Sequence, residues 1–271
     1  MVIPITLATS WRLQQLVPQR SLELLEANRL ILGASVLNMV LPSKMGDIAK
    51  AYFMSDRLNI SPSLALAISI FEKACDLLSL LLWCVFGLLL YPAKDYLFWI
   101  MTTVVTVGLA LGLLMLGSRQ FADFWFHLII ESVPKSFQQK LQKMQSSWRE
   151  MHRYFWGNKR QLLIVTTTSV FIWLLHLLQI WLFILALKAT VPFVVSLALS
   201  PLSILAGLLP LTFAGIGTRD AAIIYFYQDY LQEATAAALG ILCTSRYFIP
   251  AVIGLPFLRQ MLEAVSSRKK D

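Results

Sequence analysis

The stretch from Ser63 to Tyr91 reads SLALAISIFEKACDLLSLLLWCVFGLLLY, and it decides the class of this protein. It is longer than the roughly 20 apolar residues that a helix needs to cross a lipid bilayer. Three charged residues, Glu72, Lys73 and Asp76, nevertheless lie inside it. A charge within a bilayer is costly, so it normally faces a partner or a water-filled cavity. The stretch therefore predicts a membrane-spanning helix with a charged face.

Three further stretches have the same character, and the composition of the whole chain agrees with them. Spanning helices are predicted over Tyr96–Gly117, Gln161–Leu187 and Thr235–Leu258, the last with Arg246 and Pro250 inside it. Of the 271 residues, 58% are apolar and only 14% are charged, and the mean hydropathy is +0.68. This composition excludes a disordered chain, a basic nucleic-acid-binding domain and a typical cytosolic enzyme. We predict an all-α polytopic membrane protein.

Two other apolar stretches are interrupted before they could cross a bilayer. The first, 30–41, ends at Pro42 and is followed by a short segment up to Met54. The second, 193–211, contains prolines and a glycine and leads into a short segment up to Tyr227. Pairs of short hydrophobic segments broken in this way are typical of re-entrant or discontinuous helices.

The two interrupted stretches share a weak sequence pattern. One carries Leu41-Pro42, Gly46-Asp47 and Lys50, and the other carries Leu209-Pro210, Gly215 and Arg219-Asp220. Each is followed by an alanine-rich span with charge embedded in it. We therefore predict a single transmembrane domain over 1–271, with two repeats of inverted topology at 30–91 and 193–258.

The most polar segment, 118–160, contains eight Lys and Arg and three acidic residues. Its apolar residues recur at helical spacing after Pro134, at Phe137, Leu141, Met144, Trp148, Met151 and Phe155. This predicts an amphipathic helix that either lies on an anionic leaflet or packs on neighbouring loops. Because basic loops stay in the cytoplasm, we place this segment and the basic C-terminus there, in the inner membrane of a bacterium. The first interrupted pair then opens to the cytoplasm and the second to the outside.

Charged residues at the breaks and inside the spans are the candidates for a site. With the glycines that permit close backbone approach, the candidate substrate-binding residues are Lys44, Gly46, Asp47, Lys50, Glu72, Lys73, Asp76, Gly215, Gly217, Arg219, Asp220 and Arg246. One interpretation is a set of buried ion pairs that fix how the helices pack. The other is a site near the middle of the membrane, where the basic residues bind a phosphate and the acidic residues orient them.

The cysteines and His176 do not indicate a catalytic or metal-binding site. Cys75, Cys84 and Cys243 lie in apolar stretches without metal-binding or disulfide spacing, and we interpret them as small core residues. His176 is interpreted as a hydrogen-bonded core residue. The sequence contains no nucleotide-binding, metalloprotease or hydrolase motif, so we predict no cofactor, no metal and no catalytic residue.

Together, these motifs resemble the flippase-like membrane domain of lysylphosphatidylglycerol synthases, over about residues 9–258. The resemblance rests on Trp11-Arg12, Asn38-x3-Pro42-x3-Gly46-Asp47-x2-Lys50, Phe71-Glu72-Lys73-x2-Asp76, Leu209-Pro210, Gly215-x-Gly217-x-Arg219-Asp220 and Arg246. Lys50 and Lys73 stand where arginine is expected and Asp220 where glutamate is expected. The charge signs are kept, but two-pronged contacts of arginine with phosphate are lost at the two lysines. Family members usually carry one or two more helices before Trp11-Arg12, so the resemblance implies a chain that starts late.

The resemblance implies translocation of a phosphate-bearing lipid between leaflets rather than an enzyme activity. The lipid would be an aminoacylated phospholipid or a polyprenyl-phosphate lipid. One alternative is a membrane-embedded transferase acting on a lipid phosphate, with Glu72 or Asp76 as the base. Another is a non-catalytic partner that binds a glycosyltransferase or lipid synthase through the basic face of 118–160. A homo-oligomer stays open, and no nucleic-acid partner is expected.

Overall fold

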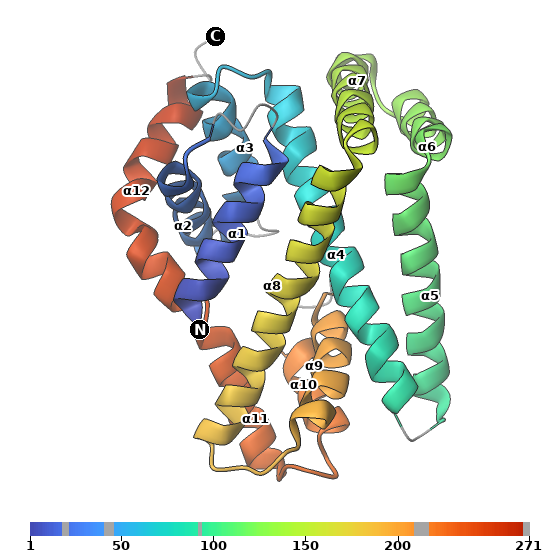
Figure 1. Cartoon of the computed structure of the whole chain (residues 1–271), viewed down its shortest axis with the longest axis vertical. Helices are drawn as coiled ribbons and strands as arrows, with labels where there is room; N and C mark the ends of the chain where they lie inside the picture. Colours follow the sequence, from blue (N-terminus) through green and yellow to red (C-terminus); the bar gives the residue numbers. More distant parts are fainter. Residues whose placement is uncertain (18–21, 41–45, 92–93, 209–216, 268–271) are drawn as a thin grey trace.

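The computed structural model describes residues 1–17, 22–40, 46–91, 94–208 and 217–267, and all regular structure within them is helical. The helices are α1 (Val2–Leu16), α2 (Leu24–Val40), α3 (Gly46–Arg57), α4 (Pro62–Leu90), α5 (Tyr96–Gly117), α6 (Arg119–Ser132), α7 (Lys135–Gly157), α8 (Lys159–Ala186), α9 (Phe193–Gly207), α10 (Thr218–Phe226), α11 (Glu233–Ser245) and α12 (Phe248–Ser267). The predicted all-α class is confirmed. The long helices α4, α5 and α8 run along the length of the molecule (Figure 1).

Among the described residues, four segments are long and apolar enough to cross a membrane, namely α4, α5, α8 and Glu233–Leu258. They coincide with the four predicted spans, and the chain is a multi-pass membrane protein. The fourth span is broken, because α11 ends at Ser245 and α12 begins at Phe248. Arg246 therefore lies at the break between two helices and not within a continuous one.

Both interrupted stretches form pairs of short helices that pack on each other. The pair α2 and α3 lies in the upper half of Figure 1, and the pair α9 and α10 lies in the lower half. The residues that link each pair, 41–45 and 209–216, are outside the described residues. Helix α9 is the most enclosed element, since every residue from Ser196 to Leu205 is buried. It packs against α4, α8 and α10.

The long helix that follows each pair packs against the first helix of the other pair. Helix α4 contacts α9, and α12 contacts α2. Both contacts pass through a glycine, because a Cβ atom at Gly87 would lie 2.2 Å from the Ala198 carbonyl oxygen, and one at Gly254 would lie 2.2 Å from the Leu32 carbonyl oxygen. Two related repeats would produce such reciprocal packing, and the inverted topology stays a prediction.

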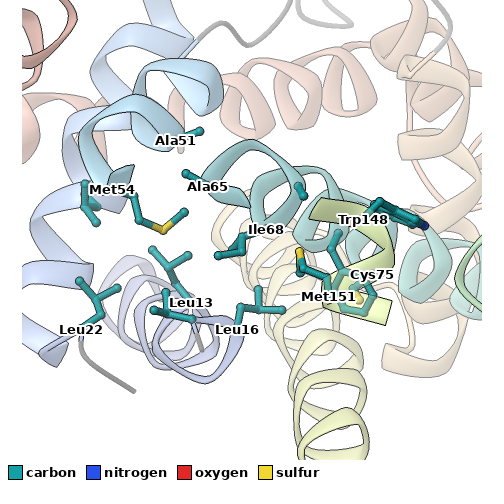
Figure 2. Packing of buried hydrophobic residues seen from close by; sticks show 14 of the residues in the cluster. Leu13, Leu16, Leu22, Ala51, Met54, Ala65, Ile68, Cys75, Trp148 and Met151 are labelled. Carbon is teal, nitrogen blue, oxygen red and sulfur yellow. The ribbon is translucent and has the colours of Figure 1, made fainter. Parts of the chain in front are cut away.

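The apolar core has two parts, which share α4 and α8. In the upper part, Leu13 and Leu16 of α1, Met54 of α3 and Ile68 of α4 converge (Figure 2). The lower part is built from α4, α5, α8, α9, α10 and α11. Helix α1, which the sequence analysis did not predict, is therefore an integral part of the upper core.

The polar segment 118–160 forms α6 and α7, and α7 begins after Pro134 as the spacing predicts. The apolar stripe of α7 faces protein, because Trp148, Met151 and Phe155 are buried. Phe71 of α4 stacks on Phe155 with ring centroids 4.7 Å apart. Of the two interpretations, packing is the closer, although the stripe packs on a helix and not on loops. The exposed large apolar side chains of this segment are Phe124, Trp125, Leu128 and Ile129 on α6, together with Trp156 and the first residue of the stripe, Phe137, on α7.

Candidate functional site

Six charged side chains meet between α1, α3 and α4, in a cluster that we call the Arg12 centre. Its members are Arg12, Asp47, Lys50, Glu72, Lys73 and Asp76. Each member contacts two others of opposite sign, so the ion pairs close into a ring in which basic and acidic residues alternate. Three positive and three negative charges balance within the ring.

Glu72 lies at the most buried point of the ring. The side chains of Glu72, Arg12 and Lys50 are each only 1% exposed. Glu72 Oε1 accepts a hydrogen bond from Arg12 Nη2 at 3.0 Å, and its Oε2 accepts one from Lys50 Nζ at 2.6 Å. Arg12 also bonds to Asp76, which lies one helical turn beyond Glu72 on α4. Both oxygens of the buried carboxylate are thus occupied.

The other side of the ring is less enclosed. Lys73 Nζ lies 3.2 Å from Asp47 Oδ2 and 3.9 Å from Asp76 Oδ2, and its side chain is 45% exposed. Asp47 also lies 3.7 Å from Lys50 Nζ, one turn along α3. The ring therefore has a deeply buried half around Glu72 and a half-exposed half around Lys73.

Close packing at the start of α3 brings its charges to α4. Gly46 begins α3, where a Cβ atom would lie 2.3 Å from the Ala34 carbonyl oxygen of α2. The sequence analysis predicted five of the six ring members but not Arg12. The one sequence signal for Arg12 was the Trp11-Arg12 motif of the resemblance.

A second cluster, which we call the Arg246 centre, lies where α9, α10 and α11 meet. It contains Arg219, Asp220 and Arg246. Arg219 Nη2 donates to Asp220 Oδ1 at 2.8 Å, to Thr244 Oγ1 at 2.6 Å and to the Gly240 carbonyl oxygen at 3.1 Å. These bonds tie the first turn of α10 to α11.

The same aspartate also caps α10. Its Oδ2 accepts a hydrogen bond from the backbone N–H of Gly217 at 3.0 Å. Gly217 has φ = 94°, a left-handed conformation that glycine adopts without the steric penalty of a side chain. The predicted site residues Gly217, Arg219 and Asp220 thus act together at one helix start.

Unlike every basic residue of the Arg12 centre, Arg246 forms no ion pair with a described carboxylate. It is only 8% exposed, and its Nη2 donates to the Tyr247 hydroxyl at 2.9 Å. Its Nε and Nη1 atoms are buried and have no hydrogen-bond partner within the described part of the chain. With Arg219 and Asp220, the described members of this centre carry one net positive charge. The guanidinium of Arg246 can therefore donate hydrogen bonds to an anion.

A small cavity lies between the two arginines. Polar side chains line it, namely Ser200, Ser203, Tyr227, Arg219 and Arg246, together with apolar ones from α8 to α11. The Tyr227 hydroxyl lies 2.7 Å from Ser200 Oγ. The cavity measures about 10 Å³, which is room for about one water molecule. A phosphate group could enter only if the lining helices moved apart.

The two centres are separate in this structure. Between their described members, no hydrogen bond or ion pair joins one to the other. Lys50 therefore does not meet Arg219 and Arg246 at one anion site in this conformation. Lys44 and Gly215 lie outside the described residues.

Other predicted features have simple outcomes. The three cysteines are buried and free. His176 lies on α8, but its Nδ1 atom is buried without a hydrogen-bond partner among the described residues, contrary to the hydrogen-bonded core residue that was expected. In the described ranges, no group of three His, Cys, Asp or Glu residues is arranged to hold a metal ion.

Comparison with known proteins places this architecture in a family. The chain belongs to the family described as the lysylphosphatidylglycerol synthase TM region, whose model matches residues 1–254. It is also similar to the UPF0104 membrane protein MJ1595 of Methanocaldococcus jannaschii. The two are 24% identical over 245 residues, which is 83% of this chain and 71% of the relative. No solved structure matches the chain.

Proposed function

We propose that this member of the lysylphosphatidylglycerol synthase TM region family moves a phosphate-bearing lipid between the two membrane leaflets. The proposed substrate is an aminoacylated phospholipid or a polyprenyl-phosphate lipid, which share the phosphate. The protein acts as a transporter and not as an enzyme. The observation that carries the proposal is Arg246, a buried guanidinium with two N–H groups that no described residue satisfies.

A buried donor without an acceptor costs about 1–3 kcal/mol, and more when it is charged. Such groups are uncommon in native proteins, and a bound ion is one explanation for them. A phosphate is the natural complement, because the planar guanidinium fork donates two parallel hydrogen bonds to its oxygens. Arg219 lies across the same cavity and is bonded to only one carboxylate. A lipid phosphate would thus find two arginines and one net positive charge.

The Arg12 centre supports transport in a different way. Its ring of ion pairs ties α1, α3 and α4 into one body, against which the α9–α10 pair could move. The ring also weakens the case for the transferase. Because both oxygens of Glu72 accept hydrogen bonds from basic residues, this carboxylate is poorly placed to take a proton from a substrate. We retain Lys50 and Lys73 as positioning residues of this ring.

The proposed orientation follows from charge. The basic segment 118–160 and the C-terminus lie in the cytoplasm of a bacterium, so the Arg12 centre is nearer the inner leaflet and the Arg246 centre nearer the outer leaflet. Lys140 and Lys143 on α7 are exposed and would contact anionic lipid or a partner enzyme.

The test is leaflet exchange in reconstituted vesicles. Vesicles of phosphatidylcholine contain a trace of a fluorescently labelled probe, either lysylphosphatidylglycerol or a polyprenyl phosphate, and a membrane-impermeant reductant bleaches the outer leaflet. We expect the wild-type protein to expose the inner probe much faster than protein-free vesicles. Arg246→Gln should slow exchange about tenfold or more, since it removes a charge-assisted contact with phosphate.

Arg57→Gln is the matched control. This arginine is 51% exposed and lies 4.0 Å from its nearest carboxylate, so exchange should not change. Equal rates for wild type and Arg246→Gln, at equal thermal stability, would contradict the proposal. Mass spectrometry of the vesicle lipids separates transport from transfer, because a transferase would leave a chemically altered lipid.

A further inference from the structure

One face of α8 connects the two charge centres. Ser169 Oγ accepts a hydrogen bond from Arg12 Nη1 at 3.1 Å, and Ile180 lines the cavity beside Arg246. These two residues are eleven positions apart on one continuous helix. Eleven residues make about three turns, so both side chains lie on the same face, about 16 Å apart along the axis. One face of α8 therefore extends from the Arg12 centre to the cavity of the Arg246 centre.

His176 lies on this face, between the two ends. It follows Ser169 by seven positions and precedes Ile180 by four, which are the spacings of a single helix face. Its imidazole is therefore a polar side chain on the part of this face that lies between the two centres.

Several buried nitrogen atoms in His176 and in the two charge centres lack a hydrogen bond to a described residue. Nδ1 of His176, Nε of Arg12 and both Nε and Nη1 of Arg246 are buried and lack a partner among the described residues. Buried polar atoms without a hydrogen bond are uncommon in protein interiors, so each one needs an explanation. Arg12 contacts Ser169 at one end of this stretch of α8, Arg246 lines the same cavity as Ile180 at the other end, and His176 lies between Ser169 and Ile180 along the helix. A phosphate has enough acceptor oxygens to complete the hydrogen bonds of each of these side chains.

We propose that His176 is the midway binding residue for the lipid phosphate on a path along α8 from Arg246 to Arg12. This inference rests on the proposed function and adds a route to it. Nδ1, when it carries the proton, donates a hydrogen bond to a phosphate oxygen while the apolar tails stay in the bilayer. Without such a donor, the phosphate would lose one hydrogen-bonding contact midway along the stretch of about 16 Å from Ile180 to Ser169. Moving a charged group through an apolar medium without hydrogen bonds is strongly unfavourable.

A purely structural role for the ring can be separated from binding. His176 packs on Trp173, with ring centroids 5.6 Å apart. His176→Phe keeps an aromatic ring at this contact and removes both nitrogens. His176→Gln removes the ring and keeps an N–H donor. A packing role predicts that the phenylalanine variant is normal, whereas a binding role predicts that the glutamine variant is the better of the two.

The experiment is the leaflet exchange described above, with the phosphate-bearing probe that the wild type exchanges, and with a fluorescent glycolipid that lacks phosphate as a second probe. We expect His176→Phe to slow exchange of the phosphate-bearing probe about tenfold, and His176→Gln to slow it threefold or less. Any slow exchange of the glycolipid should not differ between variants. Phe171→Leu is the control, since Phe171 is 50% exposed on another face of α8. Thermal unfolding in detergent checks the fold, and His176→Leu replaces His176→Phe if the latter melts lower.

The outcomes distinguish the two proposals. If the wild-type protein exchanges neither lysylphosphatidylglycerol nor the polyprenyl phosphate above protein-free vesicles, the proposed function fails and the path fails with it. If the wild type exchanges lipid and Arg246→Gln is slow, but the variants without nitrogen at position 176 match the wild type, only the path is overturned. Equal slowing of both probes would also overturn it, because the effect would then be structural.

Discussion

The two charge centres use the same kinds of side chain, yet their physical situations are opposite. In the Arg12 centre each charge has two partners of opposite sign, and the ring is neutral. In the Arg246 centre Asp220 pairs with Arg219, whereas Arg246 has no ion pair with a described carboxylate and keeps two N–H groups without a described partner. A buried charge is tolerated when hydrogen bonds replace its water, and it is costly when they do not. We therefore propose that the lack of a carboxylate partner, more than burial, marks Arg246 as a functional residue.

The largest expected effect is the removal of Glu72. Glu72→Gln would leave the buried ends of Arg12 and Lys50 with one carboxylate each and give the ring a net positive charge. Breaking a buried pair on one side typically costs about 3–5 kcal/mol. We therefore expect the free energy of unfolding to fall by about that amount. Chemical or thermal unfolding of the purified protein in detergent measures it.

Glu150→Gln provides the control for this measurement. Glu150 is exposed on α7, and a surface substitution of this kind usually changes stability by less than about 0.5 kcal/mol. If the two variants lost equal stability, the ring would not be holding α1, α3 and α4 together, and the contrast between the centres would disappear.

Arg246→Leu should not lower the free energy of unfolding, in contrast to Glu72→Gln. It removes a buried charge with unsatisfied donors and puts apolar volume in its place, a change that is often neutral or stabilising by about 1–4 kcal/mol. We expect unchanged or higher stability together with loss of lipid exchange, both measured on one preparation. If Arg246→Leu destabilised the protein as much as Glu72→Gln, Arg246 would be a residue that stabilises the fold. The proposed difference between the two centres would then be wrong.

The sequence predicted the four spans because a long apolar run is a local property, readable without knowing any neighbour. Arg12 could not be assigned in this way. It lies on a helix of only 15 residues, and its partner Glu72 is 60 positions away along the chain. Only the fold brings the two together. The pairing of charges within one helix pair or along α4 was predictable from spacing, whereas the closing of the ring was not.

Two further differences between the sequence-based predictions and the structure also arise from contacts between distant parts of the chain. The apolar stripe of α7 was predictable from its period, but period alone does not say whether lipid or protein covers it, and here Phe71 of α4 does. Arg246 was predictable as a charge inside a span. That it sits at a break and keeps unpaired donors depends on how α11 and α12 meet beside α9 and α10. Long-range packing decides both.

The smallest effect is expected at the exposed side of the ring. Lys50→Met and Lys73→Met remove the same side chain from the same ring, but the first lysine is 1% exposed and the second 45%. Without Lys73, Asp47 keeps Lys50 and Asp76 keeps Arg12, and a partly exposed ion pair is worth at most about 1 kcal/mol. Lys50→Met should cost about 3 kcal/mol, because it leaves Glu72 buried with a single partner. Unfolding of the two variants side by side is the measurement. Equal losses would mean that closure of the ring, and not the burial of its members, determines the stability of this half of the protein.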